Sequence, residues 1–95
     1  MRVVKKLTVE LFGPARRLSG QKQVTLEMDD GATLHEVIAM LVERFPQLAG
    51  PVIEPEHQLS GSYMLNYDGR RTARSLDEKP AEGDRLLLLP VDAGG

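Results

Sequence analysis

In one stretch of the chain, residues 33–46, apolar side chains recur with the period of an α-helix. In the segments on either side, apolar and polar side chains alternate, as they do in β-strands. The apolar residues of the helical stretch share one helical face: Leu34, Val37, Ile38, Leu41 and Phe45. Thr33 and Glu36 form a capping-box pattern at its start, and Pro46 ends it because a proline disfavours helical geometry in the residue before it. The sequence therefore predicts one amphipathic helix that covers the core.

Two strand patterns precede this helix. Residues 7–12 alternate between apolar and polar side chains, and so do residues 24–28. The side chains predicted to face the core are Leu7, Val9, Leu11, Val24, Leu26 and Met28. Gly13 and Pro14 break the first strand, and a short helical turn around residues 16–18 is compatible with the connection. We expect the two strands to pair antiparallel.

Further short strands follow the helix. Residues 46–62 hold three prolines and two glycines, which predicts a long loop. Strands are expected at residues 63–67, 71–73 and 85–89. This order predicts an α+β fold, a β-grasp (ubiquitin-like) roll with a mixed sheet of four to five strands and one main helix. The first and last strands would be neighbours in the middle of that sheet.

Composition excludes several classes of protein. The 95 residues suit one domain, and the chain has no cysteine, so it can form no disulfide and no thiolate metal site. A net charge of -2 argues against a nucleic-acid binder, and no apolar run approaches the ~18 residues of a membrane span. His35 and His57 lack metal-ligand spacing, so no metal is expected. We expect a soluble cytoplasmic protein.

The chain ends in two glycines after an apolar strand. We expect a domain over residues 1–89 and a flexible tail over residues 90–95. Glycine has no Cβ, so Gly94 and Gly95 would let the tail enter a narrow channel and present a carboxylate to another protein. A frayed end without a role is the alternative.

Three segments resemble a known family: residues 9–20, residues 33–46 and residues 82–95. The first ends in Arg16 and then Leu18-Ser19-Gly20, and the last runs from a Gly-Asp turn through an apolar strand and a proline to Gly-Gly. On these residues the chain resembles the MoaD/ThiS family of ubiquitin-like sulfur carriers, and within it MoaD of molybdopterin synthase.

The resemblance implies that Gly95 is a reactant and that the protein is a carrier, not an enzyme. An adenylating, MoeB- or ThiF-like partner would use ATP to attach AMP to the Gly95 carboxylate, and a sulfur donor enzyme would convert it to a thiocarboxylate. Gly94, Ala93 and Asp92 would thread the partner's channel, and the protein itself would bind no cofactor. The sulfur would serve molybdopterin (molybdenum cofactor) biosynthesis with a MoaE-like large subunit, while thiamine, cysteine and tRNA thiolation remain open.

Parity along the strands predicts a docking surface. If Leu86 and Leu88 face the helix, then Leu87 and Leu89 face away from it, near Phe12. An exposed apolar patch of this kind, continued by Pro90, favours a partner interface, and the alternative is that the loop over residues 46–62 folds across it. The three arginines at positions 70, 71 and 74 indicate either a solvated hairpin or a surface for an acidic partner.

Two other functions remain open at this point. In one, the protein is a ubiquitin-like modifier whose activated Gly95 is joined to a lysine amine of another protein. In the other, it is a β-grasp interaction module whose terminal glycines are incidental. The sequence does not separate the first of these from a sulfur carrier, because both use the same tail.

Overall fold

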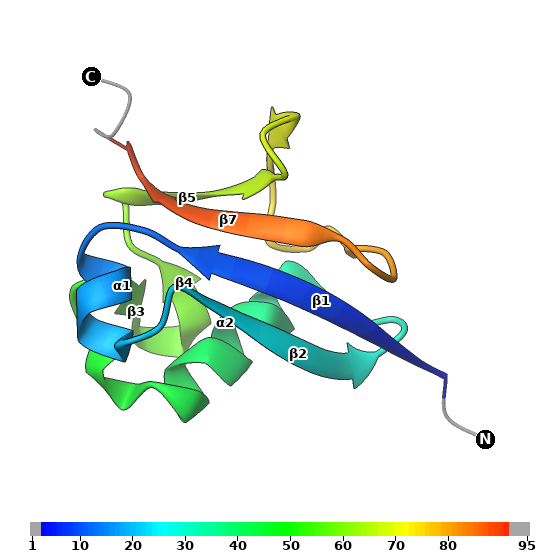
Figure 1. The fold of residues 1–95 in the computed structure, drawn as a ribbon, viewed down its shortest axis with the longest axis horizontal. Helices are drawn as coiled ribbons and strands as arrows, with labels where there is room; N and C mark the ends of the chain where they lie inside the picture. The colour runs from blue at the N-terminus through cyan, green and yellow to red at the C-terminus, as the bar shows by residue number, and fades with distance from the viewer. Residues whose placement is uncertain (1–2, 92–95) are drawn as a thin grey trace.

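The computed structural model describes residues 3–91, and its centre is a five-stranded mixed sheet (Figure 1). The strands lie in the order β2-β1-β7-β5-β6. Their bounds are Gln23–Asp29 for β2, Val4–Leu11 for β1, Arg85–Pro90 for β7, Tyr63–Tyr67 for β5 and Arg71–Thr72 for β6. β1 pairs antiparallel with β2 and parallel with β7, so the first and last strands are central neighbours. The predicted β-grasp, ubiquitin-like fold is confirmed.

Two helices lie on one face of the sheet (Figure 1). α1 covers Pro14–Ser19 in the connection between β1 and β2, where the sequence allows a helical turn. α2 covers Leu34–Arg44 and is the predicted main helix. The backbone amide of Thr33 donates a hydrogen bond to the Glu36 carboxylate at 3.5 Å, as a capping box requires.

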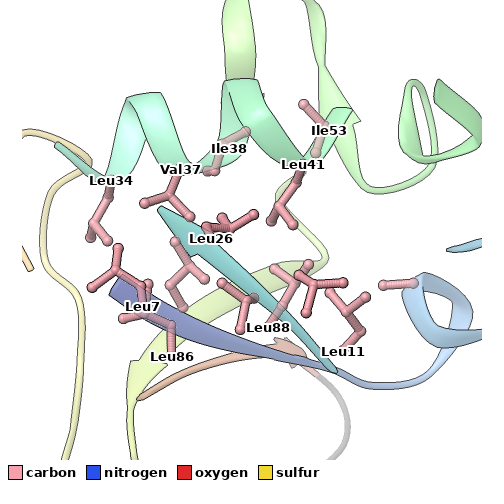
Figure 2. Packing of buried hydrophobic residues seen from close by; sticks show 14 of the residues in the cluster. Leu7, Leu11, Leu26, Leu34, Val37, Ile38, Leu41, Ile53, Leu86 and Leu88 are labelled. Carbon is pink, nitrogen blue, oxygen red and sulfur yellow. The ribbon is translucent and has the colours of Figure 1, made fainter. Parts of the chain in front are cut away.

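The core fills the space between α2 and the sheet (Figure 2). Leu86 and Leu88 of β7 are fully buried there, as their parity predicts. The other apolar residues predicted to face inward on the first two strands and on α2 are also buried, except Phe45, which is partly buried. Removing such side chains from water is worth roughly 1.5–3 kcal/mol each, so this layer is the main source of stability.

Residues 46–62 are more ordered than the predicted loop. A 3-10 turn at Pro46–Leu48 is followed by a two-stranded sheet of β3 (Ile53–Glu54) and β4 (Gln58–Leu59), which are joined by a second 3-10 turn. Leu48, Val52 and Ile53 are buried in the core cluster. Strands of two residues are too short to show a period, which is why the sequence does not reveal them.

A lysine is buried in this core. Lys5 continues the inward series of β1 and is fully buried, and its Nζ donates to the carbonyls of Ala32 at 2.8 Å and Pro80 at 2.6 Å. Both carbonyls belong to loops at the same end of the sheet, so Lys5 ties β1 to two distant connections. Within residues 3–91, none of the helices has the length and apolarity that a membrane crossing requires.

Candidate functional site

The end of β7 determines where the C-terminal segment leaves the domain. Pro90 pairs with Tyr63 of β5, and the amide of Val91 donates to the Ser62 carbonyl at 2.8 Å. The sheet therefore holds Pro90 and Val91, although the predicted domain ends at residue 89. The predicted tail residues Asp92, Ala93, Gly94 and Gly95 lie outside the described part of the chain.

A tight contact supports this exit point. Gly13 has a φ of 61°, and a Cβ added there would lie 2.7 Å from Cγ of Pro90. The hydroxyl of Tyr63 accepts a hydrogen bond from the Ala15 amide at 2.9 Å and donates one to the Phe12 carbonyl at 3.3 Å. Gly13 is therefore required for both its backbone angle and its lack of a side chain, and it lets the turn after β1 pack directly on Pro90.

We expect Gly13→Ala to lower the free energy of unfolding by about 2 to 5 kcal/mol, because the strain of the backbone angle adds to the clash with the rigid proline ring. Gly20→Ala is the matched control, since Gly20 has a φ of 73° but nothing within 4 Å of the added Cβ. Gly20→Ala should lower the free energy of unfolding only by the cost of the positive φ angle, about 1 to 2 kcal/mol. Urea denaturation of both variants measures the difference, and equal losses would contradict the contact.

The open face of the sheet carries the predicted apolar patch. Phe12, Leu87 and Leu89 are each partly exposed, in contrast to Leu86 and Leu88 of β7, which are fully buried. Met64 of β5 pairs with Leu89 and is also partly exposed, so it belongs to the same face. We call Phe12, Met64, Leu87 and Leu89 the outer patch. Met64 was not predicted as part of it, although alternation along β5 places Met64 on the face opposite to the buried Tyr63 and Leu65.

Arg16 adds a positive charge beside the outer patch. Its Nε donates to the Leu11 carbonyl at 2.8 Å, and its guanidinium lies over the Phe12 ring at 5.0 Å from the centroid. At this distance a cation–π interaction holds both side chains. The sequence pointed to Arg16 only as part of the family pattern, and the structure places it next to Phe12 of the outer patch.

Residues 46–62 lie on the other side of the sheet. Their two 3-10 turns contact α1 and α2, and Figure 1 shows β3 and β4 on the helical side. The alternative in which this segment folds over the outer patch is therefore wrong. The hydrophobic side chains of the segment add to the core on the helical side of the sheet.

The arginine-rich hairpin is partly engaged within the chain. Glu78 Oε1 accepts hydrogen bonds from Tyr67 Oη and from Arg71 Nη2, both at 3.0 Å. Its Oε2 accepts from the amides of Arg74 at 2.8 Å and Ser75 at 3.2 Å. The Arg71 guanidinium also lies 4.3 Å from the Tyr67 ring centroid. This cluster holds the loop after β6 and favours the structural interpretation for Arg71.

The cluster shifts two pKa values. The backbone amide of Arg74, followed by Arg71 and Tyr67, lowers the pKa of Glu78 to about 2 from its ordinary value of 4.5. Burial, followed by the Glu78 carboxylate, raises the pKa of Tyr67 to about 12. The carboxylate is therefore the form that the folded state prefers.

Because the pKa of Glu78 is lowered by folding, its contribution to stability is complete above its ordinary value and is lost as the pH falls from 4.5 toward 2. We expect Glu78→Gln to reduce the free energy of unfolding at neutral pH by about 1 to 2 kcal/mol. The difference from the unmodified protein should shrink below pH 4.5. Urea denaturation between pH 7 and pH 2.5 measures it, with the neighbouring Asp77→Asn as control; a difference independent of pH would refute the role of the carboxylate.

The two histidines lie apart from the outer patch. Nε2 of His35 lies 2.8 Å from Nε2 of Gln58, and His57 is exposed with a φ of 57°. Among residues 3–91, no group of three or more His, Cys, Asp or Glu side chains is arranged to hold a metal ion.

Comparison with known proteins assigns the family. The ThiS family matches residues 9–95, which is nearly the whole chain. The chain belongs to the ThiS family. Members of this family are small carrier proteins without catalytic activity, and they are activated by ThiF- or MoeB-like enzymes. The predicted family is thus confirmed.

Two relatives and one solved structure refine this assignment. Small archaeal modifier protein 3 of Haloferax volcanii is 32% identical over 97 residues, covering 95% of this chain and 99% of its own. Small archaeal modifier protein 1 of the same organism is 29% identical and covers 90% of this chain and 97% of its own. The crystal structure of SAMP1 from Haloferax volcanii has a TM-score of 0.81 at 28% identity and covers 95% of this chain and 99% of its own.

The comparison with MoaD rests on weaker similarity. A Pyrococcus furiosus protein assigned as subunit 1 of a molybdopterin converting factor has a TM-score of 0.73 at 24% identity and covers 90% of this chain and 97% of its own. At that identity the likeness concerns the fold alone. The predicted membership of the MoaD/ThiS family therefore holds, whereas the finer prediction of a MoaD protein is not supported, because the relatives described above are small archaeal modifier proteins.

Proposed function

We propose that this chain is a ubiquitin-like sulfur carrier and protein modifier whose activated group is the carboxylate of Gly95. The observation that carries the proposal is the family match, which runs from β1 to the terminal Gly94 and Gly95. The two curated relatives, both small archaeal modifier proteins, support the modifier role.

The chemistry needs only a free terminal carboxylate on this chain. A carboxylate oxygen of Gly95 attacks the α-phosphate of ATP in the activating enzyme, and pyrophosphate leaves. For modification, a lysine amine attacks the acyl carbon of the adenylate, AMP leaves, and an amide forms. For sulfur transfer, a persulfide sulfur attacks instead, AMP leaves, and a second thiol cleaves the S–S bond to release the thiocarboxylate.

The geometry of the exit supports this role. β7 ends beside the outer patch, and Gly13 and Tyr63 hold Pro90 and the turn after β1 in place. A partner that binds Phe12, Leu87, Leu89 and Pro90 would take up the chain that follows Val91 directly, so Asp92, Ala93 and Gly94 would span the distance to its active site. The partners proposed are an adenylating enzyme of the ThiF or MoeB type and a sulfur donor enzyme.

The sulfur acceptor is the pathway or molecule that would receive sulfur from Gly95. Molybdopterin synthesis with a MoaE-like large subunit remains a candidate, as do thiamine, cysteine and tRNA thiolation. The names of the curated relatives favour transfer of the whole protein to a lysine of another protein over any single one of these pathways.

Intact-mass spectrometry tests the proposal. The protein is incubated with a ThiF- or MoeB-like enzyme, ATP and a persulfide donor, with and without a lysine-containing protein. Replacement of one oxygen by sulfur indicates a carrier, a covalent adduct that maps to Gly95 and a lysine indicates a modifier, and both products are expected. An unchanged mass under all conditions would leave only the interaction module.

A further inference from the structure

A second surface lies away from the end of β7, in a groove between β2 and α2. It has a volume of about 460 Å³ and is lined by the start of β1, by β2 and by α2. Because β1 and β7 are parallel, Val4 at the start of β1 lies at the opposite end of the sheet from Pro90. A molecule bound in this groove would leave the outer patch and the tail accessible.

The helical wall of the groove is a second stripe of α2, next to its core stripe. Glu36, Ala39, Met40 and Glu43 recur at helical spacing and all line the groove. The two carboxylates lie at its ends and the two apolar side chains lie between them. Glu36 and Glu43 are seven residues apart, which is about 10 Å along the helix axis.

The strand wall is an open sheet edge. β2 is the first strand in the sheet order and pairs with β1 alone. The Leu11 amide donates to the Lys22 carbonyl, and antiparallel pairing then alternates, so the backbone groups of Thr25 and Glu27 point away from β1. The bond from Arg44 Nη1 to the Thr25 carbonyl, at 3.2 Å, agrees with this direction. Glu27 therefore offers an outward N–H and C=O to another strand.

The charges select the occupant. Glu27, Glu36 and Glu43 line the groove, and the Arg44 guanidinium is bonded to the Thr25 carbonyl of the same strand as Glu27. A second copy of this chain would bring the same carboxylates together, which disfavours edge-to-edge dimers. Met28 and Met40 give the floor an apolar surface that can adapt to different side chains.

We propose that this groove binds an extended, lysine- or arginine-bearing segment of a partner protein, which adds a strand to the β2 edge. Its backbone would pair with Glu27, one apolar side chain would lie on Met28 and Met40, and its cations would lie near Glu36 and Glu43. Cations two to four residues apart on one face of a strand are about 7 to 13 Å apart, which brackets the helical spacing. The site would recognise the carrier independently of its tail.

A synthetic probe tests the proposal by NMR titration of the full chain labelled with ¹⁵N. The probe is a capped seven-residue peptide, Ser-Lys-Ser-Val-Ser-Lys-Ser, which places the Val and both Lys on one face of a strand, and its controls replace both Lys by Glu or the central Val by Pro. We expect the lysine peptide to shift the amides of residues 25–29 and 36–43, and the binding to weaken with salt. The glutamate peptide should not bind, and the proline peptide should bind at least fivefold more weakly, because proline lacks the N–H that pairs with the edge.

Matched variants separate the groove from general charge attraction. Glu43→Lys and Glu54→Lys make the same change in net charge at exposed positions, inside and outside the groove. We expect at least a fivefold loss of peptide affinity for the first and less than twofold for the second, with unchanged adenylation of Gly95 in both. Equal losses, shifts elsewhere on the chain, or concentration-dependent dimerisation of the free protein would each overturn the proposal.

Discussion

Deletion of Gly95 is expected to abolish adenylation by the activating enzyme while leaving the melting temperature nearly unchanged. Removal of one residue moves the terminal carboxylate by roughly 3.3 to 3.6 Å along an extended chain. A misplacement of even 1 Å costs on the order of 100-fold in rate, so the α-phosphate would be out of reach. The core packs residues that come before the tail, and its stability should not respond.

ATP–pyrophosphate exchange, run beside a melting curve, measures this effect. Extension of the chain by one residue beyond Gly95 should abolish exchange in the same way, since it displaces the carboxylate in the other direction. Ala93→Gly is the matched control, because it changes a tail side chain and keeps the length, and it should retain most of the activity. Full exchange by the shortened protein would remove Gly95 from the mechanism.

The second large effect concerns the outer patch. We expect Leu89→Asp to weaken binding of the activating enzyme by 30-fold or more, since an apolar side chain at the centre of an interface is often worth about 2 kcal/mol. Phe12→Asp should have a similar effect, with a further loss of the contact to Arg16. Both residues are only partly buried, so the circular dichroism spectrum should be preserved.

Leu88→Asp is the control for this prediction, because Leu88 is adjacent in β7 and has no exposed surface. A charge introduced there would be buried without a partner, and we expect the protein to unfold or lose several kcal/mol of stability. Titration calorimetry with the activating enzyme and thermal denaturation separate the two outcomes. Loss of structure in Leu89→Asp would show that the outer patch belongs to the core and is not an interface.

The main helix and the central strands were predictable because their signals are local. In β7, Leu86 and Leu88 are buried, and Leu87 and Leu89 are partly exposed. This alternation was predictable because successive side chains of any β-strand point to opposite faces of the sheet. The boundaries of α2 follow from Thr33 and Pro46 for the same reason, since capping and the proline clash act over a few residues.

The candidate site was predictable only in part. Parity along the strands predicted Phe12, Leu87 and Leu89, and the pattern of the last residues pointed to Gly95. Met64 belongs to the outer patch only because β5 pairs with β7, and Arg16 lies beside the patch only because α1 folds next to the end of β1. The role of Gly13 depends on its contact with Pro90, a residue near the other end of the chain. Sequence patterns that extend over a few residues cannot predict such a contact.

What the sequence determined by itself is therefore the fold class, the main helix and the direction of each strand's side chains, because these depend on short-range periodicity and on backbone sterics. Tertiary structure alone decided which secondary structure residues 46–62 adopt. Buried Leu48, Val52 and Ile53 stabilise two strands there, and these strands are too short to show an alternating pattern in the sequence. Tertiary structure also decided the partners of buried Lys5, whose acceptors lie 27 and 75 residues away. Such contacts form only when the collapsed chain brings distant backbone carbonyls to a group that must not be left unpaired.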